Sequence, residues 1–474
     1  MANNIIWQEF NGISDSLFSG VKNSFYRMVG INRTSQPGSI TVHQALAKDS
    51  GSTITALCRN AITLSNTGAK LWFSYTDGKI WHELSGIYTL VYTTAPAAGN
   101  AGCLGAFEYN TYVYWATQSR LHRIPIANAT ATAADWTANV TADWQTFSKT
   151  DSEFHPMKVQ NATLWIGDGN LVASVNSSAT FTASALNMVA PLRCKTFFPF
   201  DIDLVVGTII TTNINECQII RWDTIQTSWQ YSETVWENGI NAFLWTGTTL
   251  LAQAGTQGNW YYYDGVKLQP YKRIPGTWSP TSYGDVSPNA VGVLLNIPIF
   301  GFSNGSGNPA DQGIYSLGSY SKDYTKVISG PDFPLSTGNV TGITIGAIIV
   351  DGSNLYAAWQ DGSDFGIDKL NYSAKYASAY LETLRITPSV ENMSTTYRIF
   401  ANYQSLPSGT DCTFKYKKNN DTSYTTLTSV NDTVNARLYA ELTIDHRAFQ
   451  ARIEFTVSGN TAPILEAVGI ELVN

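Results

Sequence analysis

Seven copies of one short pattern dominate the sequence: an apolar, aromatic strand, a polar turn rich in Gly, Asp, Asn or Ser, and a second apolar strand. The first copy reads Leu71-Trp72-Phe73, turn, Ile80-Trp81, and the third reads Leu164-Trp165-Ile166, turn, Leu171-Val172. The copies begin at residues 71, 112, 164, 204, 250, 299 and 355, which are 40 to 56 residues apart. This spacing is typical of the four-stranded blades of a β-propeller, whose strand edges are covered when the blades stack into a ring.

The pattern therefore predicts an all-β chain with a seven-bladed β-propeller at residues 51–375. Asp-Gly pairs in the turns supply the positive-φ positions that tight hairpins need. They stand at Asp77-Gly78, Asp168-Gly169, Asp264-Gly265, Asp351-Gly352 and Asp361-Gly362. Six and eight blades remain alternatives, because one copy can be a variant strand pair. A propeller hosts many unrelated functions, so the fold alone does not give the function.

Two segments flank the repeats. Residues 1–50 form an N-terminal segment that leads into the ring, and we expect its Ile5-Ile6-Trp7 strand to close the ring. From residue 376 the repeat spacing stops and strands follow closely, so residues 376–474 are predicted to form a separate C-terminal β-sandwich. The expected strands of this sandwich are Tyr380–Ile386, Tyr397–Phe400, Cys412–Lys417, Leu438–Ile444, Ala451–Val457 and Ile464–Val473.

The composition is unusually poor in charge. Charged residues make up 14% of the 474 residues, against about 25% in a typical globular protein. Hydrophobic residues (43%) and aromatic residues (12%) are sufficient for a large core. The surface must then be covered mainly by Thr, Ser, Asn, Gln and Gly, as in rigid extracellular or virion proteins. The net charge of −7 gives no argument for nucleic-acid binding.

Cysteine usage and the absence of targeting segments indicate synthesis in a cytoplasm. The five cysteines are scattered, contain no CxxC pair and are odd in number, which favours isolated buried thiols over a disulfide framework. The N-terminus shows neither a basic region nor a long apolar run, so we expect no signal peptide. No stretch approaches 18 apolar residues, so we expect no membrane span.

The sequence offers no convincing catalytic, cofactor or metal site. The five histidines have no metal-ligand spacing, and no Gly-x-Ser-x-Gly elbow, phosphate loop or dinucleotide fingerprint occurs. The closest carboxylate pairs are Asp201 with Asp203, Glu233 with Glu237, and Asp361 with Asp364. Their short spacing on strands and turns does not place two carboxyls across a glycosidic bond. We therefore predict no catalytic, cofactor-binding or metal-binding residues and no enzymatic activity.

Two turns carry oxygen ligands suited to Ca²⁺, at residues 351–354 and 361–364. Neither continues into a twelve-residue loop with a terminal Glu, so we interpret both as hairpin turns.

Tryptophans form two groups. Those at strand positions are expected to pack between blades: Trp72, Trp81, Trp115, Trp165, Trp222, Trp260 and Trp359. Those in or near the loops between copies are Trp136, Trp144, Trp229, Trp236 and Trp278. If exposed, the second group is suited to stacking on sugar rings or to anchoring a protein partner.

One turn resembles a known motif. Residues 74–81 are similar to the Asp-box of sialidase-like propellers, with Ser74, Gly78 and Trp81 in place, whereas Thr76 and Ile80 depart from it. That motif braces a hairpin and does no chemistry, so the resemblance supports a blade and says nothing about glycosidase activity.

The two ends of the chain resemble the tail proteins of tailed bacteriophages. The N-terminal run has a Gly-Ile-x-Asp-Ser opening at residues 12–16, an Asn-containing strand at 23–25 and a Pro-Gly turn at 37–38. Phe449–Val457, Thr461–Leu465 and the last strand resemble the terminal β-domain of the same proteins. The match covers about the first 85 and the last 95 residues. It implies a structural role of the tail nozzle or tail-tip type and carries over no catalytic residues.

We therefore expect a structural component of a phage virion, made in the host cytoplasm and assembled in the tail as a homo-oligomer with other tail proteins. If it lines a DNA channel, its modest negative charge would suit DNA passage without specific binding. The alternative is a glycan-binding or receptor-binding propeller for host attachment, which exposed loop tryptophans would favour. A propeller glycosidase ranks third and would need a carboxylate pair in a pocket.

Overall fold

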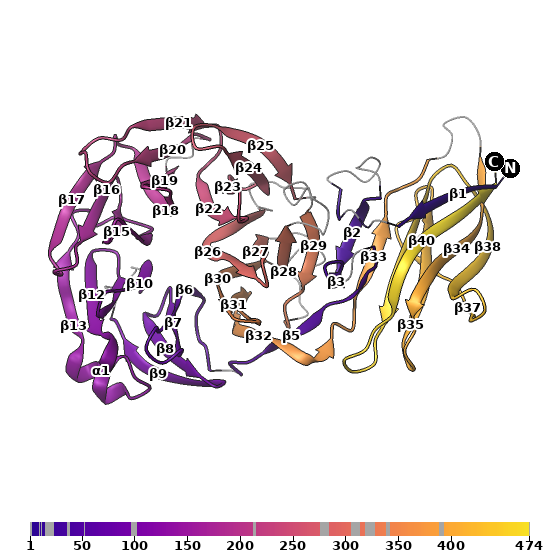
Figure 1. Cartoon of the computed structure of the whole chain (residues 1–474), viewed down its shortest axis with the longest axis horizontal. Coiled ribbons are helices and arrows are strands. Elements are labelled where there is room, and N and C mark those ends of the chain that lie inside the picture. Colours follow the sequence, from indigo (N-terminus) through magenta and orange to yellow (C-terminus); the bar gives the residue numbers. More distant parts are fainter. Residues whose placement is uncertain are drawn as a thin grey trace.

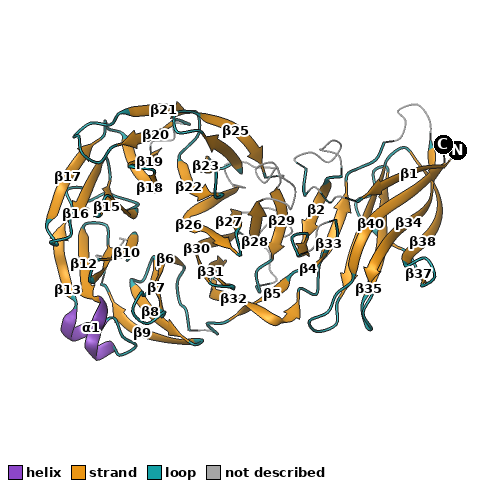
Figure 2. Cartoon of the chain, in the orientation of Figure 1, coloured by secondary structure: helices purple, strands orange, loops and turns teal. Residues whose placement is uncertain are grey.

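The computed structural model describes residues 2–8, 10, 12–14, 23–35, 38–51, 53–95, 102–211, 215–274, 284–304, 313–317, 328–337, 342–387 and 393–473. A ring of small sheets lies beside a β-sandwich that contains both chain termini (Figure 1). Figure 2 shows that nearly all of the regular structure is strand. Within the described ranges the helical elements are η1 (Ile126–Asn128) and α1 (Ala133–Asn139). Neither of them is long enough to cross a membrane.

The ring is a seven-bladed β-propeller of four-stranded antiparallel blades. Blades 1 to 4 consist of β6 (Cys58–Thr63), β7 (Lys70–Ser74), β8 (Lys79–Leu84) and β9 (Ile87–Thr93); β10 (Gly105–Tyr109), β11 (Tyr112–Ala116), β12 (Arg120–Pro125) and β13 (Thr141–Thr146); β14 (Met157–Gln160), β15 (Thr163–Asp168), β16 (Leu171–Val175) and β17 (Phe181–Asn187); and β18 (Leu192–Phe200), β19 (Asp203–Ile210), β20 (Cys217–Trp222) and β21 (Tyr231–Val235).

Blades 5 to 7 complete the ring. They consist of β22 (Ile240–Trp245), β23 (Leu250–Ala254), β24 (Asn259–Tyr263) and β25 (Leu268–Arg273); β26 (Gly284–Leu294), β27 (Ile297–Asn304), β28 (Gly313–Leu317) and β29 (Ile328–Phe333); and β30 (Ile343–Asp351), β31 (Asn354–Asp361), β32 (Asp364–Lys375) and β5 (Gln44–Lys48). A single parallel bridge, Asn289 to Ala347, joins blades 6 and 7. The seven sequence copies are the second and third strands of the seven blades, so the predicted fold is confirmed.

Large aromatic side chains fill the spaces between blades. All seven strand tryptophans are buried, as predicted. Trp115 of blade 2 packs against Phe73 of blade 1, with ring centroids 6.5 Å apart. Trp165 of blade 3 meets Trp222 of blade 4 edge to face at 4.8 Å. Because each blade offers such a residue to its neighbour, burial of apolar surface holds the ring together.

The ring is closed by the N-terminal segment, although not by the strand that we expected. β5 is the outer strand of blade 7 and pairs antiparallel with β32, with Leu46 opposite Leu370. The N–H of Asp49 extends this pairing by donating to the carbonyl of Ile367 (2.9 Å). The innermost strands of the first and last blades, β6 and β30, also lie side by side. Blade 7 therefore combines residues from both ends of the propeller sequence.

The prediction that Ile5-Ile6-Trp7 closes the ring is wrong. These residues belong to β1 (Ala2–Trp7), which pairs with the sandwich strand β40 (Ile464–Val473) and places Ile5 opposite Ile470. Their apolar composition correctly indicates a strand. It does not specify which of two open sheet edges the strand joins, because main-chain pairing is indifferent to sequence.

The sandwich consists of two five-stranded sheets, each with one strand from the N-terminal segment. The first sheet has the order β1, β40, β34 (Ser394–Ser405), β38 (Arg437–His446) and β37 (Val430–Asp432). The second has the order β2 (Phe25–Val29), β33 (Tyr380–Thr383), β39 (Phe449–Thr456), β35 (Asp411–Lys418) and β36 (Thr425–Thr426). The six predicted C-terminal strands all occur, and β1 and β2 complete the two sheets.

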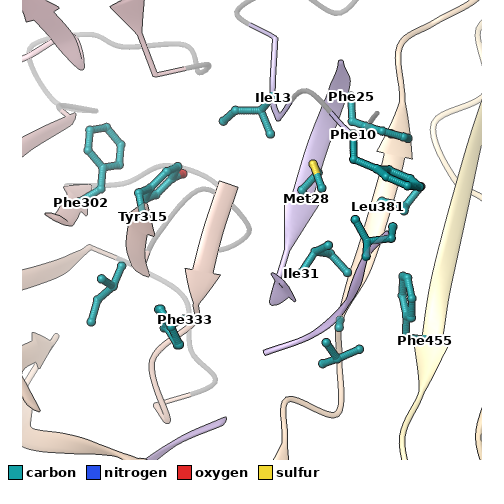
Figure 3. Close-up of a cluster of buried hydrophobic side chains, with 14 of the residues drawn as sticks. Phe10, Ile13, Phe25, Met28, Ile31, Phe302, Tyr315, Phe333, Leu381 and Phe455 are labelled. Atoms are coloured by element: carbon teal, nitrogen blue, oxygen red, sulfur yellow. The ribbon is translucent and has the colours of Figure 1, made fainter. Parts of the chain in front are cut away.

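The N-terminal segment also fills the junction between the propeller and the sandwich. Figure 3 shows its apolar side chains between those of blade 6 and those of the sandwich. The residues that meet in this cluster are Phe10, Ile13, Phe25, Met28 and Ile31 of the segment, Phe302, Tyr315 and Phe333 of blade 6, and Leu381 and Phe455 of the sandwich. The short pair β3 (Ile31–Asn32) and β4 (Thr41–Val42) follows. One continuous core therefore spans both parts.

Main-chain contacts at this junction are tight. The N–H of Gly30 donates to the carbonyl of Pro331 (2.9 Å). A Cβ at Gly330 would lie 1.8 Å from the carbonyl oxygen of Met28, so blade 6 can approach the segment this closely only with glycine at that position.

Candidate functional site

The propeller channel contains a cavity of about 310 Å³. It is lined by the first strands of blades 1, 2, 3, 4, 6 and 7 and by the loop that leads into blade 3. These innermost strands lie around the central opening in Figure 1. The cavity also reaches Glu153, which is exposed, so it is open to solvent. Its size lies at the lower end of the range for small-molecule sites, about 300–1,000 Å³.

The first strands of several blades bring charged side chains into this cavity. Cys58 and Cys194 are buried between blades, whereas the next residues, Arg59 and Lys195, line the cavity. On β14, Met157 and Lys158 both line the cavity. The strand register shifts at Arg59 and at Lys195, so both basic residues stand at irregular positions, where a bulge can redirect a side chain.

Lys195 and Asp285 bring opposite charges to the cavity lining. The Lys195 ammonium donates to Oδ1 of Asn241 (2.5 Å) and lies 5.2 Å from the centre of the Phe154 ring. Burial lowers the pKa of Lys195, and the negative charge of Asp285 opposes this shift. Burial likewise raises the pKa of Asp285, while Lys195 and Arg59 favour its charged form. Each group thus partly compensates the desolvation of the other.

Lys158 and Arg59 also line the cavity. The Lys158 ammonium lies 5.9 Å from the centre of the Phe107 ring, and it has no hydrogen bond or ion pair with any residue that the structure describes. Burial lowers its pKa. The Arg59 guanidinium stacks on the Tyr75 ring at 3.7 Å and likewise has no hydrogen-bond acceptor among the described residues. Asn289 fixes the strand beneath it by donating to the Arg59 carbonyl (3.0 Å).

The carboxylate pairs suggested by the sequence do not line this cavity. Asp203 pairs with Arg221, and Asp201 occupies the adjoining turn with φ of 57°. Asp361 accepts the Thr337 hydroxyl (2.6 Å), and Asp364, exposed at the start of β32, stands opposite it in the strand pair. Both pairs therefore stand at hairpins.

The third pair is also structural. Glu237 accepts the Tyr261 hydroxyl (2.7 Å), and Glu233 accepts the N–H of Leu268 (2.7 Å). Both carboxylates thus hold strands of blade 5 against the end of blade 4.

The two turns considered for Ca²⁺ are hairpin turns, as interpreted. They connect β30 to β31 and β31 to β32, and Gly352 and Gly362 both have φ of 59°. The Asp351 carboxylate pairs with the Lys70 ammonium (3.0 Å). Across the described ranges, no group of three or more His, Cys, Asp or Glu side chains is arranged to hold a metal ion.

The loop tryptophans differ in exposure. Trp136 lies on α1 and is fully buried between blades 1 and 2, so its interpretation as a loop aromatic is wrong. A helix of seven residues, less than two turns, is too short for its periodicity to be recognised in the sequence. Trp144 and Trp229 are half-buried against neighbouring apolar residues. Trp236 is 78% exposed. Trp278 lies outside the described residues.

Histidine and cysteine have structural roles. His155 stacks on Phe147 (4.1 Å), and its ring nitrogens contact the carbonyl oxygens of Gly167 (2.5 Å) and Gln118 (3.2 Å), which links blades 2 and 3. All five cysteines are free and buried, as predicted: Cys58, Cys103, Cys194, Cys217 and Cys412. Burial raises the pKa of each thiol, to about 12 for the first, second and fourth.

Sequence reasoning missed the cavity residues. Arg59, Lys158, Lys195 and Asp285 are isolated charges on otherwise apolar strands, and they are up to 226 residues apart in the chain. The sequence does contain one signal for this site, which is a charged residue on the first strand of four different blades. That signal indicates a common site only after those strands are known to surround one channel.

Comparisons with known proteins show no family and no function. No protein-family model matches the chain, and no curated protein sequence matches it. An extracellular domain assigned to a hybrid two component system of B. thetaiotaomicron is 14% identical over 75% of this chain, with a TM-score of 0.46. The chain spans 43% of the length of that structure.

Two shorter structures are matched over nearly their full length. BamB from Moraxella catarrhalis is 10% identical, with 72% of this chain and 96% of that chain covered and a TM-score of 0.40. The Pan2 WD40 domain of Neurospora crassa is 4% identical, with 73% and 99% covered and a TM-score of 0.42. At these identities the likeness is one of fold, and it transfers no activity or partner.

Proposed function

We propose that this protein is a structural subunit of a bacteriophage tail, of the nozzle or tail-tip type, which assembles with copies of itself and with other tail proteins. The observation that carries the proposal is the path of the N-terminal segment. It supplies β1 and β2 to the sandwich, packs its apolar residues into the junction, and then supplies β5 to blade 7.

This path couples the two parts mechanically. Separating the sandwich from the propeller would expose the apolar junction, to which the N-terminal segment, blade 6 and the sandwich all contribute. Domains joined by a flexible linker keep their relative motion, whereas these two share one core. A part that holds neighbours in fixed positions needs this rigidity.

The composition supports the same role. A charge-poor surface and buried free thiols suit a virion part that is made in the reducing cytoplasm of the host. The resemblance of both chain ends to tail proteins supports the assignment independently of the fold.

If this subunit lines a tail lumen, DNA would pass through a ring of subunits and not through the channel of one propeller. The channel of one propeller contains a cavity of about 310 Å³, the size of a small-molecule site. The modest negative charge of the chain would then keep DNA from adhering to the lumen.

Immunogold labelling tests this assignment. Antibodies against the purified chain are applied to particles produced by the genome that encodes it. We expect label at the tail of intact particles and a band at the full chain length in the protein profile of those particles. A chain that occurs in the infected-cell lysate and is absent from purified particles would overturn the proposal.

A further inference from the structure

We propose that the propeller channel binds a sugar that bears a carboxylate, such as a hexuronic acid residue. The proposal goes beyond the structural role and does not rest on it, because the site is formed by one propeller alone.

The first argument is the state of two basic groups. Lys158 and Arg59 line the cavity, and neither side chain donates a hydrogen bond or forms an ion pair within the described part of the chain. Removing a cation from water without a counter-charge is costly. The Lys158 ammonium would give a sugar carboxylate charge-assisted hydrogen bonds, and the Arg59 guanidinium would donate to hydroxyl oxygens of the same sugar.

The second argument is the balance of charge. The cavity is lined by three basic residues, Arg59, Lys158 and Lys195, and by two acidic residues, Glu153 and Asp285. The positive charges of Lys195 and Arg59 favour the charged form of Asp285, without a direct ion pair among these residues. The lining therefore carries one net positive charge, which matches a ligand with a single negative charge.

The third argument is the mixture of surfaces. The rings of Phe107 and Phe154 line the cavity and offer apolar faces against which a sugar ring can stack. Asn289, Ser287 and the Asp285 carboxylate offer donors and acceptors for hydroxyl groups. A bare inorganic anion would contact only the basic groups. An acidic sugar would contact the basic groups, the aromatic rings and the hydrogen-bonding groups.

Glucuronic acid and glucose make a matched pair of probes, because they differ only in the carboxylate. Binding to the full-length protein is measured by saturation-transfer NMR and by calorimetry, with inorganic phosphate as a third probe. We expect saturable binding of glucuronic acid, and binding of glucose and phosphate at least about tenfold weaker. A tenfold difference in affinity is the effect that we expect from one charge-assisted hydrogen bond to the carboxylate.

Variants locate the site. Lys158→Gln and Arg59→Gln should each weaken the binding of glucuronic acid at least about tenfold, and Lys158→Arg should retain most of it because the positive charge remains. Lys267→Gln is the matched control, since Lys267 is exposed in a turn of blade 5 outside the cavity. Thermal unfolding followed by tryptophan fluorescence shows that each variant is folded.

Three results would overturn the proposal. The first is equal binding of glucose and glucuronic acid. The second is binding of phosphate that is tighter than that of glucuronic acid, which would indicate a general anion site. The third is binding of glucuronic acid that folded Lys158→Gln and Arg59→Gln proteins retain unchanged.

Discussion

Closure of the ring by β5 leads to a specific prediction about Leu46. This side chain is 6% exposed and belongs to the large apolar cluster of the propeller and sandwich. It stands opposite Leu370 in the strand pair that joins the N-terminal segment to blade 7. Substitution Leu46→Ala removes buried methyl groups at the closure and leaves the backbone pairing possible.

The expected cost follows from this burial. Leu-to-Ala substitutions at fully buried sites cost about 2–5 kcal/mol, depending on how far the site collapses. Leu46 is almost fully buried on an outer strand, where relaxation is easier than in the ring interior. We therefore expect a loss of about 3 kcal/mol in the free energy of unfolding of the propeller. Ala47→Ser, at the exposed neighbouring position, should change it by less than about 0.5 kcal/mol.

Urea unfolding followed by tryptophan fluorescence measures this loss, because the seven strand tryptophans report on the spaces between blades. Hydrogen exchange read by mass spectrometry locates it. Peptides covering β5 and β32 should exchange faster in Leu46→Ala than in Ala47→Ser, since opening begins where the closure is weakened. The reasoning is refuted if both variants unfold at the same urea concentration, or if faster exchange is confined to blades that β5 does not touch.

Three further predictions concern packing, pH and thiol reactivity. A Cβ at Gly105 would lie 1.8 Å from the His155 carbonyl oxygen, so Gly105→Ala should lower Tm by several degrees. Gly292→Ala should lower Tm far less, because the nearest neighbour of its Cβ would be a methyl group at 3.1 Å. Equal Tm values of the two variants would contradict this prediction. Burial lowers the pKa of His122 from 6.5 to about 4, and its Nδ1 accepts the Asp143 N–H (3.0 Å), so the folded imidazole is neutral. Because the unfolded chain binds this proton more readily, stability falls as pH drops from about 6.5 toward 4, by about 2 kcal/mol at pH 5. His122→Gln should lack that part of the loss in urea titrations at pH 7 and pH 5, and an equal loss in both proteins would refute the assignment. Burial raises the pKa of all five thiols, so an aromatic disulfide reagent should label none of them rapidly before unfolding, and rapid labelling of two or more would contradict the buried arrangement.

The blades could be predicted from the sequence because their signals are local. A turn such as Asp77-Gly78 and the aromatic residues beside it, Trp72 and Trp81, lie within ten residues of one another, and together they define one hairpin. The same holds for the C-terminal strands, where the alternation from Arg452 to Val457 shows which face is buried.

The pairing of the N-terminal strands could not be predicted in this way. Ile5 and Leu46 both occur in apolar runs that suit a strand, yet one run joins the sandwich and the other closes the ring. The choice depends on which sheet edge is open once the rest has folded. The cavity is even harder to predict from the sequence, because Arg59, Lys158 and Lys195 come to line one cavity only when the ring is closed.

The mass and symmetry of the purified full-length protein test the proposed role most directly. Light scattering gives the mass, and cryo-electron microscopy of the same sample gives the symmetry. The account predicts a homo-oligomer with rotational symmetry, either a ring suited to a nozzle or a smaller assembly suited to a tail tip. A monomer of 51.9 kDa at every concentration, with no symmetric particles in the images, would contradict it.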